Sequence, residues 1–236
     1  MGEGTEPRLR IPRSLPTYAV RAPLARWLAR EAARAYADLG PYRLLDVGCG
    51  RKPYASLFAP YATSYVGVDP VPNPQAELQG FVEDLPLEDA TCDVAICIQV
   101  LEHCDDPARA VSELARVVAP TGRVLVSTHG VMAYHPSPTD YWRWTHTGLE
   151  KLFRENADWT SVTVTPASGT TACLGMIASL YLDLAARRAH IGPVARPLVT
   201  AINTVAAAVD NRSTRLREPG PGTLFANFHV VAERPA

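Results

Sequence analysis

Residues 93–128, DVAICIQVLEHCDDPARAVSELARVVAPTGRVLVST, contain the pattern that decides the fold. The first eight of them are almost continuously apolar, which predicts a strand buried on both faces of a sheet. Asp106 predicts a helix N-cap with Pro107 at the first helical position. After a turn at 120–122, residues 123–127 predict the next strand. This strand–helix–strand unit indicates a mostly parallel sheet covered on both faces by helices.

The same alternation continues on both sides of this unit. Helices are predicted over 23–39, which Gly40-Pro41 ends, and from a capping box at Thr147 through Asn156. Further strands are predicted over 43–47, 64–68, 159–165 and 226–232. The fold class expected from this order is α/β.

One stretch does not fit the simple alternation. Between the last two strands, residues of about 170–215 carry two helical patterns, which predict a helical insertion. The first, 174–188, is apolar nearly all round, and the second carries Leu198, Ile202, Val205 and Val209 on one side. We expect residues 1–16 to form a flexible tail and residues 17–236 to form a single domain.

Composition excludes several classes of function. A net charge of −1 provides no basic field to attract nucleic acid. The five cysteines are odd in number and irregularly spaced, which favours a reducing compartment. The N-terminus lacks the apolar core of a signal peptide, and the longest apolar stretch, 172–182, is shorter than the ~20 residues that span a bilayer. A cytoplasmic location is expected.

Polar and glycine residues follow four predicted strands, at the edge where parallel sheets bind ligands. They are the turn Asp46–Gly50, then Asp69, Asp84 and the stretch Gln99–His103. Gly48 and Gly50 permit a tight turn with no side chain between backbone and ligand. The third glycine of a dinucleotide fingerprint is replaced by Pro53, which disfavours pyrophosphate binding. Asp69, 19 residues after Gly50, is placed to accept hydrogen bonds from ribose hydroxyls.

From Leu44 to Ser127 the order and spacing of four blocks resemble the class I S-adenosylmethionine-dependent methyltransferases, in the group that includes the ubiquinone-biosynthesis type. The blocks are LLDVGCG, YVGVD, VEDLPLEDATCDVAICIQVLEH and DDPARAVSELARVVAPTGRVLVS. The resemblance implies a Rossmann-like doubly wound sheet of seven strands, mostly parallel with the last antiparallel. It implies S-adenosylmethionine as the cofactor and no metal. The cofactor-binding residues that it implies are Asp46, Gly48, Cys49 and Gly50 along the methionine half, Asp69 and Pro70 at the ribose, Asp84 and Leu85 at the adenine, and Gln99 near the sulfonium.

The sequence departs from this family pattern after the glycine turn. Arg51-Lys52-Pro53-Tyr54 replaces the usual small residue and glycine, and the segment 71–80 is short for a helix. Together with the segment 135–146, which reads HPSPTDYWRWTH, these features resemble a subset of the family associated with polysaccharide and glycolipid assembly.

The segment 135–146 and His103 supply the candidate residues for chemistry. A histidine beside a carboxylate can remove a proton from an acceptor hydroxyl. Catalytic roles are therefore predicted for His135, Asp140 and His103, and acceptor contacts for Tyr141, Trp142, Arg143, Trp144 and His146. The alternatives are an aromatic lid held by an Asp140–Arg143 pair and a structural His103. The cysteines show no zinc-ligand spacing.

The predicted function is O-methylation of a sugar hydroxyl in a saccharide, glycolipid or glycosylated metabolite. One alternative is a natural-product methyltransferase acting on a phenol, nitrogen or carbon. Others are a membrane-surface protein and a cofactor-binding pseudo-enzyme. The expected partner is a small-molecule or glycan acceptor, and the apolar insertion remains open as a lid, a homodimer face or a peripheral membrane contact.

Overall fold

The strands form one seven-stranded sheet in the computed structural model, which describes residues 10–136 and 138–236. Their order is β3-β2-β1-β4-β5-β7-β6, and β7 runs antiparallel to β5 and β6 while the other pairs are parallel. The strands are β1 Tyr42–Val47, β2 Ala62–Asp69, β3 Leu78–Gln79, β4 Cys92–Ile98, β5 Val118–His129, β6 Ser161–Pro166 and β7 Asn227–Glu233. The Rossmann-like doubly wound fold expected from the sequence is therefore confirmed.

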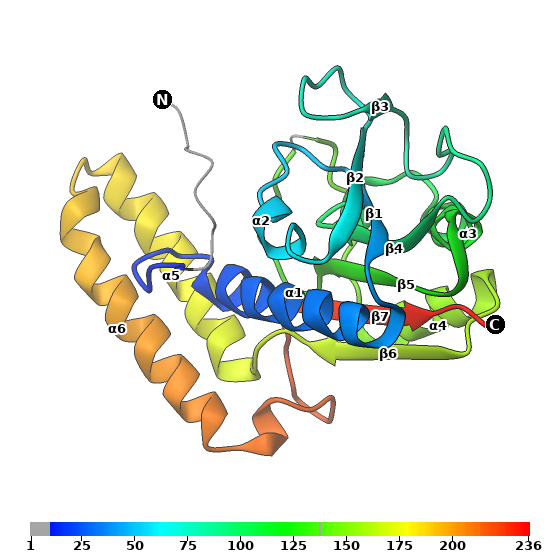
Figure 1. Ribbon diagram of the computed structural model, residues 1–236. Helices are drawn as coiled ribbons and strands as arrows, with labels where there is room; N and C mark the ends of the chain where they lie inside the picture. Colours follow the sequence, from blue (N-terminus) through cyan, green and yellow to red (C-terminus); the bar gives the residue numbers. More distant parts are fainter. Residues whose placement is uncertain (1–9, 137) are drawn as a thin grey trace.

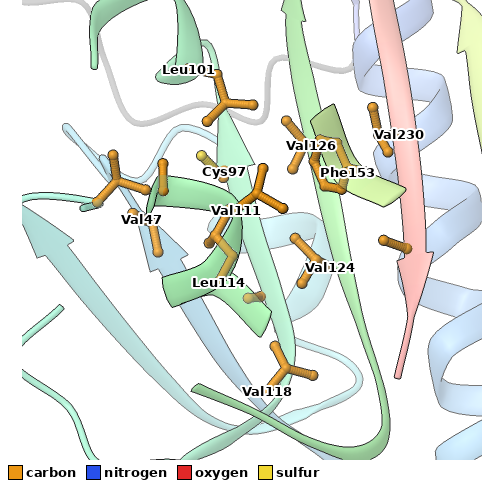
Figure 2. Packing of buried hydrophobic residues seen from close by; sticks show 14 of the residues in the cluster. Val47, Cys97, Leu101, Val111, Leu114, Val118, Val124, Val126, Phe153 and Val230 are labelled. Carbon is orange, nitrogen blue, oxygen red and sulfur yellow. The ribbon is translucent and has the colours of Figure 1, made fainter. Parts of the chain in front are cut away.

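Helices cover both faces of this sheet (Figure 1). On one face α3 and α4 pack over β4, β5 and β7 through Val111, Leu114 and Phe153 (Figure 2). On the other face α1 and α2 bury Leu24, Leu28 and Phe58. The α-helices are α1 Tyr18–Leu39, α2 Ala55–Phe58, α3 Pro107–Val117, α4 His146–Asn156, α5 Thr170–Arg188 and α6 Gly192–Asn211, and two short 3₁₀ helices are η1 Leu101–His103 and η2 Thr214–Leu216.

The β4–α3–β5 unit forms as its sequence predicts. Asp106 Oδ1 accepts hydrogen bonds from the backbone N–H groups of Ala108 and Arg109, both at 3.1 Å. Because these N–H groups have no partner within the helix, the carboxylate fixes where α3 begins. The apolar face of α3 then lies on the sheet, so the polypeptide reaches β5 after one crossover.

Several predicted boundaries are wrong. The helix predicted over 23–39 begins at Tyr18, and the strand predicted over 159–165 begins at Ser161. The N-cap of α4 is Thr145, whose Oγ1 accepts a hydrogen bond from Gly148 N, so the helix begins two residues earlier than a cap at Thr147 would allow. The predicted turn at 120–122 lies inside β5, where the pairing with β4 shifts register and Thr121 has a positive φ of 64°.

The predicted insertion is a helical hairpin, α5–α6, between β6 and β7 (Figure 1, yellow and orange). Its base is closed where Ala167 N donates to Asn227 O at 2.9 Å. Asp210 of α6 caps the start of α5 by accepting from the N–H groups of Thr171 and Ala172. Asn203, also of α6, donates to the carbonyl oxygens of Arg13 and Leu15, which holds that part of the predicted tail, while residues 1–9 lie outside the described residues.

The apolar positions of α6 do not all face inward. The buried residues of α6 are Ala195, Val199, Asn203, Ala206 and Asp210. Leu198, Val205 and Val209, which the sequence places on one side of this helix, are 53%, 61% and 37% exposed. Among the described residues, none of the helices has the length and apolar character needed to cross a bilayer.

Replacing Asp106 by alanine is expected to lower the free energy of unfolding by about 1 kcal/mol, because two N–H groups at the start of α3 lose their acceptor. Asp106→Asn, which keeps a side-chain oxygen, is the matched control and should retain most of the stability. Urea unfolding followed by circular dichroism measures both, and equal stability of Asp106→Ala and wild type would contradict the capping role.

Candidate active site

A cavity of about 730 Å³ lies beyond the carboxyl ends of β1, β2 and β4. This volume is in the range of small-molecule sites, and the position is where open α/β sheets bind ligands. Of the residues predicted to bind cofactor, those that line the cavity are Gly48, Asp69, Pro70 and Gln99. Of the predicted catalytic and acceptor residues, those that line it are His103 and Tyr141.

The glycine turn after β1 forms one wall. Gly48 has a φ of +69°, and a Cβ atom there would lie 2.3 Å from Val100 Cγ2. Only glycine fits, because any side chain would both strain the backbone and displace Val100. The N–H groups of Gly48 and Cys49 donate to Val68 O at 2.8 and 3.1 Å, which ties the turn to β2.

Asp69 connects the turn to the cavity. One carboxylate oxygen accepts from Gly50 N at 3.0 Å, and the other accepts from Val71 N at 3.2 Å. The side chain is only 7% exposed and lines the cavity. The Asn73 amide also donates to this side chain, at 3.3 Å, and a carboxylate has about four acceptor positions, so Asp69 retains capacity for one more donor such as a ligand hydroxyl.

Asp46 and Cys49 support the turn from behind and do not line the cavity. The hydroxyl of Tyr65 donates to Asp46 Oδ2 at 2.5 Å. Burial raises the pKa of Asp46 to about 7 and that of the Cys49 thiol to about 11, so neither adds a full negative charge to the site at neutral pH. Lys52, in the segment that departs from the family pattern, pairs with Glu77 at 2.6 Å and lies over the Tyr65 ring.

The predicted adenine contacts lie apart from the cavity wall. The Asp84 side chain is 87% exposed and lies 3.8 Å from Arg109, whereas Leu85 is buried in the core. The acidic residues that do line the cavity are Asp69, Glu83 and Asp105. Asp46 and Glu102 are buried and Asp84 points to solvent, so these three acids do not line the cavity.

Gln99 belongs to a buried network that the sequence did not reveal. Its φ of 59° is unusual for a residue with a side chain. The amide nitrogen of Gln99 donates to Ser127 Oγ at 2.9 Å and to Asn227 Oδ1 at 3.0 Å. Asn227 comes from β7, 128 residues away, so no local pattern identifies it.

His103, His135 and Asp140 come together beside the cavity, as their predicted roles require. His103 Nδ1 donates to Thr139 O at 2.9 Å, which leaves Nε2 as the acceptor nitrogen. Burial lowers the pKa of His103, so the ring is neutral at pH 7. His135 Nδ1 lies 3.1 Å from Asp140 Oδ2, and the centroids of the two histidine rings are 4.9 Å apart.

A metal ion does not suit this cluster, although ligand atoms of His103, His135 and Asp140 lie within 4.8 Å of one another. Both oxygens of Asp140 accept from the Arg143 guanidinium, at 2.5 and 2.6 Å, and one also accepts from His135 N. The guanidinium holds the pKa of Asp140 well below its usual range. A cation would have to displace Arg143, so the arrangement fits proton transfer better than metal binding.

A second buried pair, Glu102 and His129, lies next to the histidine cluster and was missed in the sequence. Glu102 Oε1 is 3.2 Å from His129 Nε2, and the His129 ring is 5.6 Å from that of His135. His129 Nδ1 donates to Asn227 Oδ1, so in a neutral His129 ring Nε2 carries no proton and faces Glu102 Oε1, which has no other hydrogen-bond partner among the described residues. Burial raises the pKa of Glu102 to about 7 and lowers that of His129 to about 3, in agreement with two neutral groups.

Most of the aromatic segment after β5 packs into the protein. Trp142 Nε1 donates to Cys104 O at 2.8 Å, and its ring stacks on Trp144 at 5.8 Å. His146 Nε2 lies 3.0 Å from Val164 O. Tyr141, 52% exposed, lines the cavity together with Pro138 and Thr139 of the same segment, and it is joined there by Phe81, which is 64% exposed.

Comparisons with known proteins agree with this architecture. The sequence profile of a methyltransferase-domain family matches residues 18–158. A probable S-adenosylmethionine-dependent methyltransferase of Mycolicibacterium smegmatis is 36% identical over 103 residues, which cover 39% of this chain and 40% of the relative. The uncharacterized methyltransferase YcgJ of Bacillus subtilis is 33% identical over 104 residues, 37% of this chain and 41% of that protein. The match thus spans about two fifths of the length of these relatives.

Solved structures share the fold at low sequence identity. YcgJ of Bacillus subtilis aligns over 89% of this chain and 98% of its own, with a TM-score of 0.52 and 19% identity. The Burkholderia thailandensis 1,6-didemethyltoxoflavin-N1-methyltransferase, solved with S-adenosylhomocysteine, has a TM-score of 0.51 and 16% identity over 89% and 79% of the two chains. The [4+2]-cyclase SpnF has a TM-score of 0.56 and 18% identity over 92% and 83%.

Glu102→Gln is expected to change how stability depends on pH. A carboxyl group whose pKa is raised from 4.5 to about 7 on folding stabilises the fold below pH 4.5, and this contribution is lost as the pH rises toward 7. A glutamine amide can still donate to His129 and accept from Thr128, but it does not ionise. As the pH rises from 4.5 to 7, the free energy of unfolding of the variant relative to that of wild type should therefore increase by up to about 3 kcal/mol.

Urea unfolding at a series of pH values tests this expectation. Glu155→Gln on α4 is the control, since Glu155 is 58% exposed and its curve should run parallel to that of wild type. Parallel curves for Glu102→Gln and wild type would show that Glu102 is ionised in the folded protein.

Proposed function

Because the chain belongs to the class I S-adenosylmethionine-dependent methyltransferase family, we propose that it transfers a methyl group to a hydroxyl of a saccharide, glycolipid or glycosylated metabolite. The observation that carries this proposal is the pair of oriented histidines beside the cavity that contains Gly48 and Asp69. A hydroxyl acceptor must lose a proton during transfer, and a neutral histidine can take it.

The residues present fit the cofactor. Gly48 lines the cavity without a side chain, and Asp69 can accept from a ribose hydroxyl. Pro70 lies beside Asp69 on the cavity wall. The cavity contains the carboxyl groups of Asp69, Glu83 and Asp105, which suit the positive charge of a sulfonium. When bound, S-adenosylmethionine supplies an electrophilic methyl group attached to that sulfur.

His103 is the proposed proton acceptor. His103 lines the cavity, and its lowered pKa keeps the ring neutral. Because Nδ1 donates to Thr139 O, Nε2 carries no proton and can accept one. Nε2 of His103 would take the proton that an acceptor hydroxyl releases on methylation. His135, held by Asp140, packs edge-on against His103 and acts as a positioning residue.

The sugar assignment is supported by Tyr141 and Phe81 on the cavity wall, since exposed aromatic rings offer flat surfaces to a pyranose. We propose that four further residues fix the conformation of segment 135–146 through the contacts described above. They are Trp142, Arg143, Trp144 and His146. A cytoplasmic location is also part of the proposal, because all five cysteines are buried and free.

A panel of acceptors tests the substrate class. Transfer of a labelled methyl group to glycosides and glycolipids, with no transfer to phenols or amines lacking a sugar, is the expected result. Transfer to an aromatic amine or phenol alone would instead establish the natural-product alternative. Cofactor binding without transfer to any member of a broad panel would favour the pseudo-enzyme alternative.

Asp69→Asn is expected to weaken S-adenosylmethionine binding by about 10- to 100-fold, the effect of losing charged hydrogen bonds. Asp84→Asn is the matched control and should change affinity less than about threefold, since its side chain is 87% exposed and lies off the cavity wall. Isothermal titration calorimetry measures both dissociation constants. Unchanged affinity in Asp69→Asn would remove Asp69 from the ribose site.

His103→Ala is expected to lower kcat by about 10²- to 10⁴-fold while cofactor affinity stays unchanged. His135→Ala should cause a smaller loss, because His135 acts through His103. The wild-type rate should fall as the pH drops through a value below 6.5, where His103 becomes protonated. A rate that is the same in His103→Ala and wild type, or independent of pH in this range, would exclude His103 as the proton acceptor.

A further inference from the structure

The hairpin formed by α5 and α6 presents an apolar outer face. The two helices pack closely on their inner sides, where a Cβ atom at Gly175 would lie 3.2 Å from both Ala206 Cβ and Ile202 Cγ2. α5 also contacts α1 through the cluster that contains Cys173 and Met176. These contacts use the inner side of each helix and leave the opposite side uncovered in the described part of the chain.

Large apolar side chains occupy that outer side on both helices. On α6, Leu198, Val205 and Val209 follow at intervals of seven and four residues, so they share one side of the helix. On α5, Leu174 and Tyr181 are 51% and 65% exposed at the same seven-residue interval. Isolated exposed apolar residues are ordinary, but here they recur in rows along two helices that pack against each other, and such rows indicate an interaction surface.

The insertion that contains this hairpin is basic in an otherwise acidic protein. Residues 167–226, between β6 and β7, contain six arginines, two aspartates and one glutamate, a net charge of +3, whereas the whole chain has −1 and the remainder therefore −4. Both aspartates are already used, because Asp183 pairs with Arg187 at 2.6 Å and Asp210 caps α5. In the described residues, arginines without a carboxylate in ion-pair range are Arg188, Arg196, Arg212, Arg215 and Arg217.

These arginines stand at both ends of the apolar rows. Arg188 and Arg196 lie at the tip, where α5 turns into α6, and Arg212, Arg215 and Arg217 follow from the other end of α6. A second copy of the chain is a poor fit for this face. Two such faces packed together, parallel or antiparallel, would bring five unpaired arginines of each copy near those of the other, and Glu218 is the one unpaired acid that the described residues of the insertion offer against them.

We propose that the α5–α6 hairpin docks on the surface of an anionic lipid bilayer. The apolar rows enter the boundary between headgroups and acyl chains, and the arginines at both ends bind lipid phosphates. Docking needs no membrane-spanning segment, and it does not depend on the identity of the acceptor.

The packing also connects the hairpin to the active site. Val131 and Met132, which begin the segment that leads to His135, pack against α5 residues Cys173 and Met176. A docked hairpin therefore brings this wall of the active site close to the bilayer, within reach of a lipid-borne acceptor. That consequence rests on the proposed function, whereas the docking stands without it.

Vesicle co-sedimentation of the full chain, with no cofactor or acceptor present, tests the docking. The protein should bind vesicles of phosphatidylcholine mixed with phosphatidylglycerol, and it should bind pure phosphatidylcholine at least about tenfold more weakly. Leu198→Ser combined with Val205→Ser should reduce binding to the anionic vesicles by at least about tenfold. Arg188→Gln combined with Arg196→Gln should reduce it by roughly 25-fold, about fivefold for each charge.

Matched controls lie away from the hairpin. Tyr36→Ser on α1 removes an apolar side chain that is 43% exposed, and Arg154→Gln on α4 removes a charge from an exposed arginine, so neither should change binding. Equally weak binding of the wild-type protein to both vesicle types would overturn the proposal. A second result would also overturn it: the wild-type protein does not bind vesicles and sediments as a dimer, and Leu198→Ser with Val205→Ser converts this dimer to a monomer. That result would assign the face to a second copy of the chain.

Discussion

The close approach of Val100 to Gly48 is the constraint on which the site depends. A Cβ atom at Gly48 would lie 2.3 Å from the Val100 side chain. The turn after β1 can therefore contact the segment after β4 only because position 48 has no side chain. Their contact holds the carboxyl ends of two adjacent parallel strands at a fixed separation. The cavity, the position of Asp69 and the start of the histidine cluster all follow from that separation.

The sequence predicted those parts whose signals are local. A buried strand, the cap at Asp106 and the order of strand ends each depend on a few consecutive residues, and the structure agrees with them. Gly48 and Asp69 could be predicted as site residues for the same reason, because Gly48 directly follows a strand and Asp69 ends one. By contrast, the pairing of Glu102 with His129, and of His129 with Asn227, joins three segments that no local pattern relates.

The direction of the α6 side chains was also beyond the sequence. A row of Leu198, Val205 and Val209 has the spacing of a core-facing stripe, and periodicity alone does not distinguish a core from an outer surface. The buried side of α6 instead carries Asn203 and Asp210, whose hydrogen bonds to the N-terminal segment and to α5 satisfy their polar groups. The polar residues Asn203 and Asp210 of α6 therefore make internal hydrogen bonds, whereas the apolar row on the same helix is exposed.

The hydrogen bond from Ala167 to Asn227 at the base of the insertion has a consequence for how such proteins can diversify. Because β6 and β7 are neighbours in the sheet, the polypeptide leaves and re-enters it at almost the same point. Lengthening a loop whose ends are already fixed costs little additional entropy. The tip of the hairpin, where α5 turns into α6, can therefore be shortened or extended during evolution while the strands keep their register.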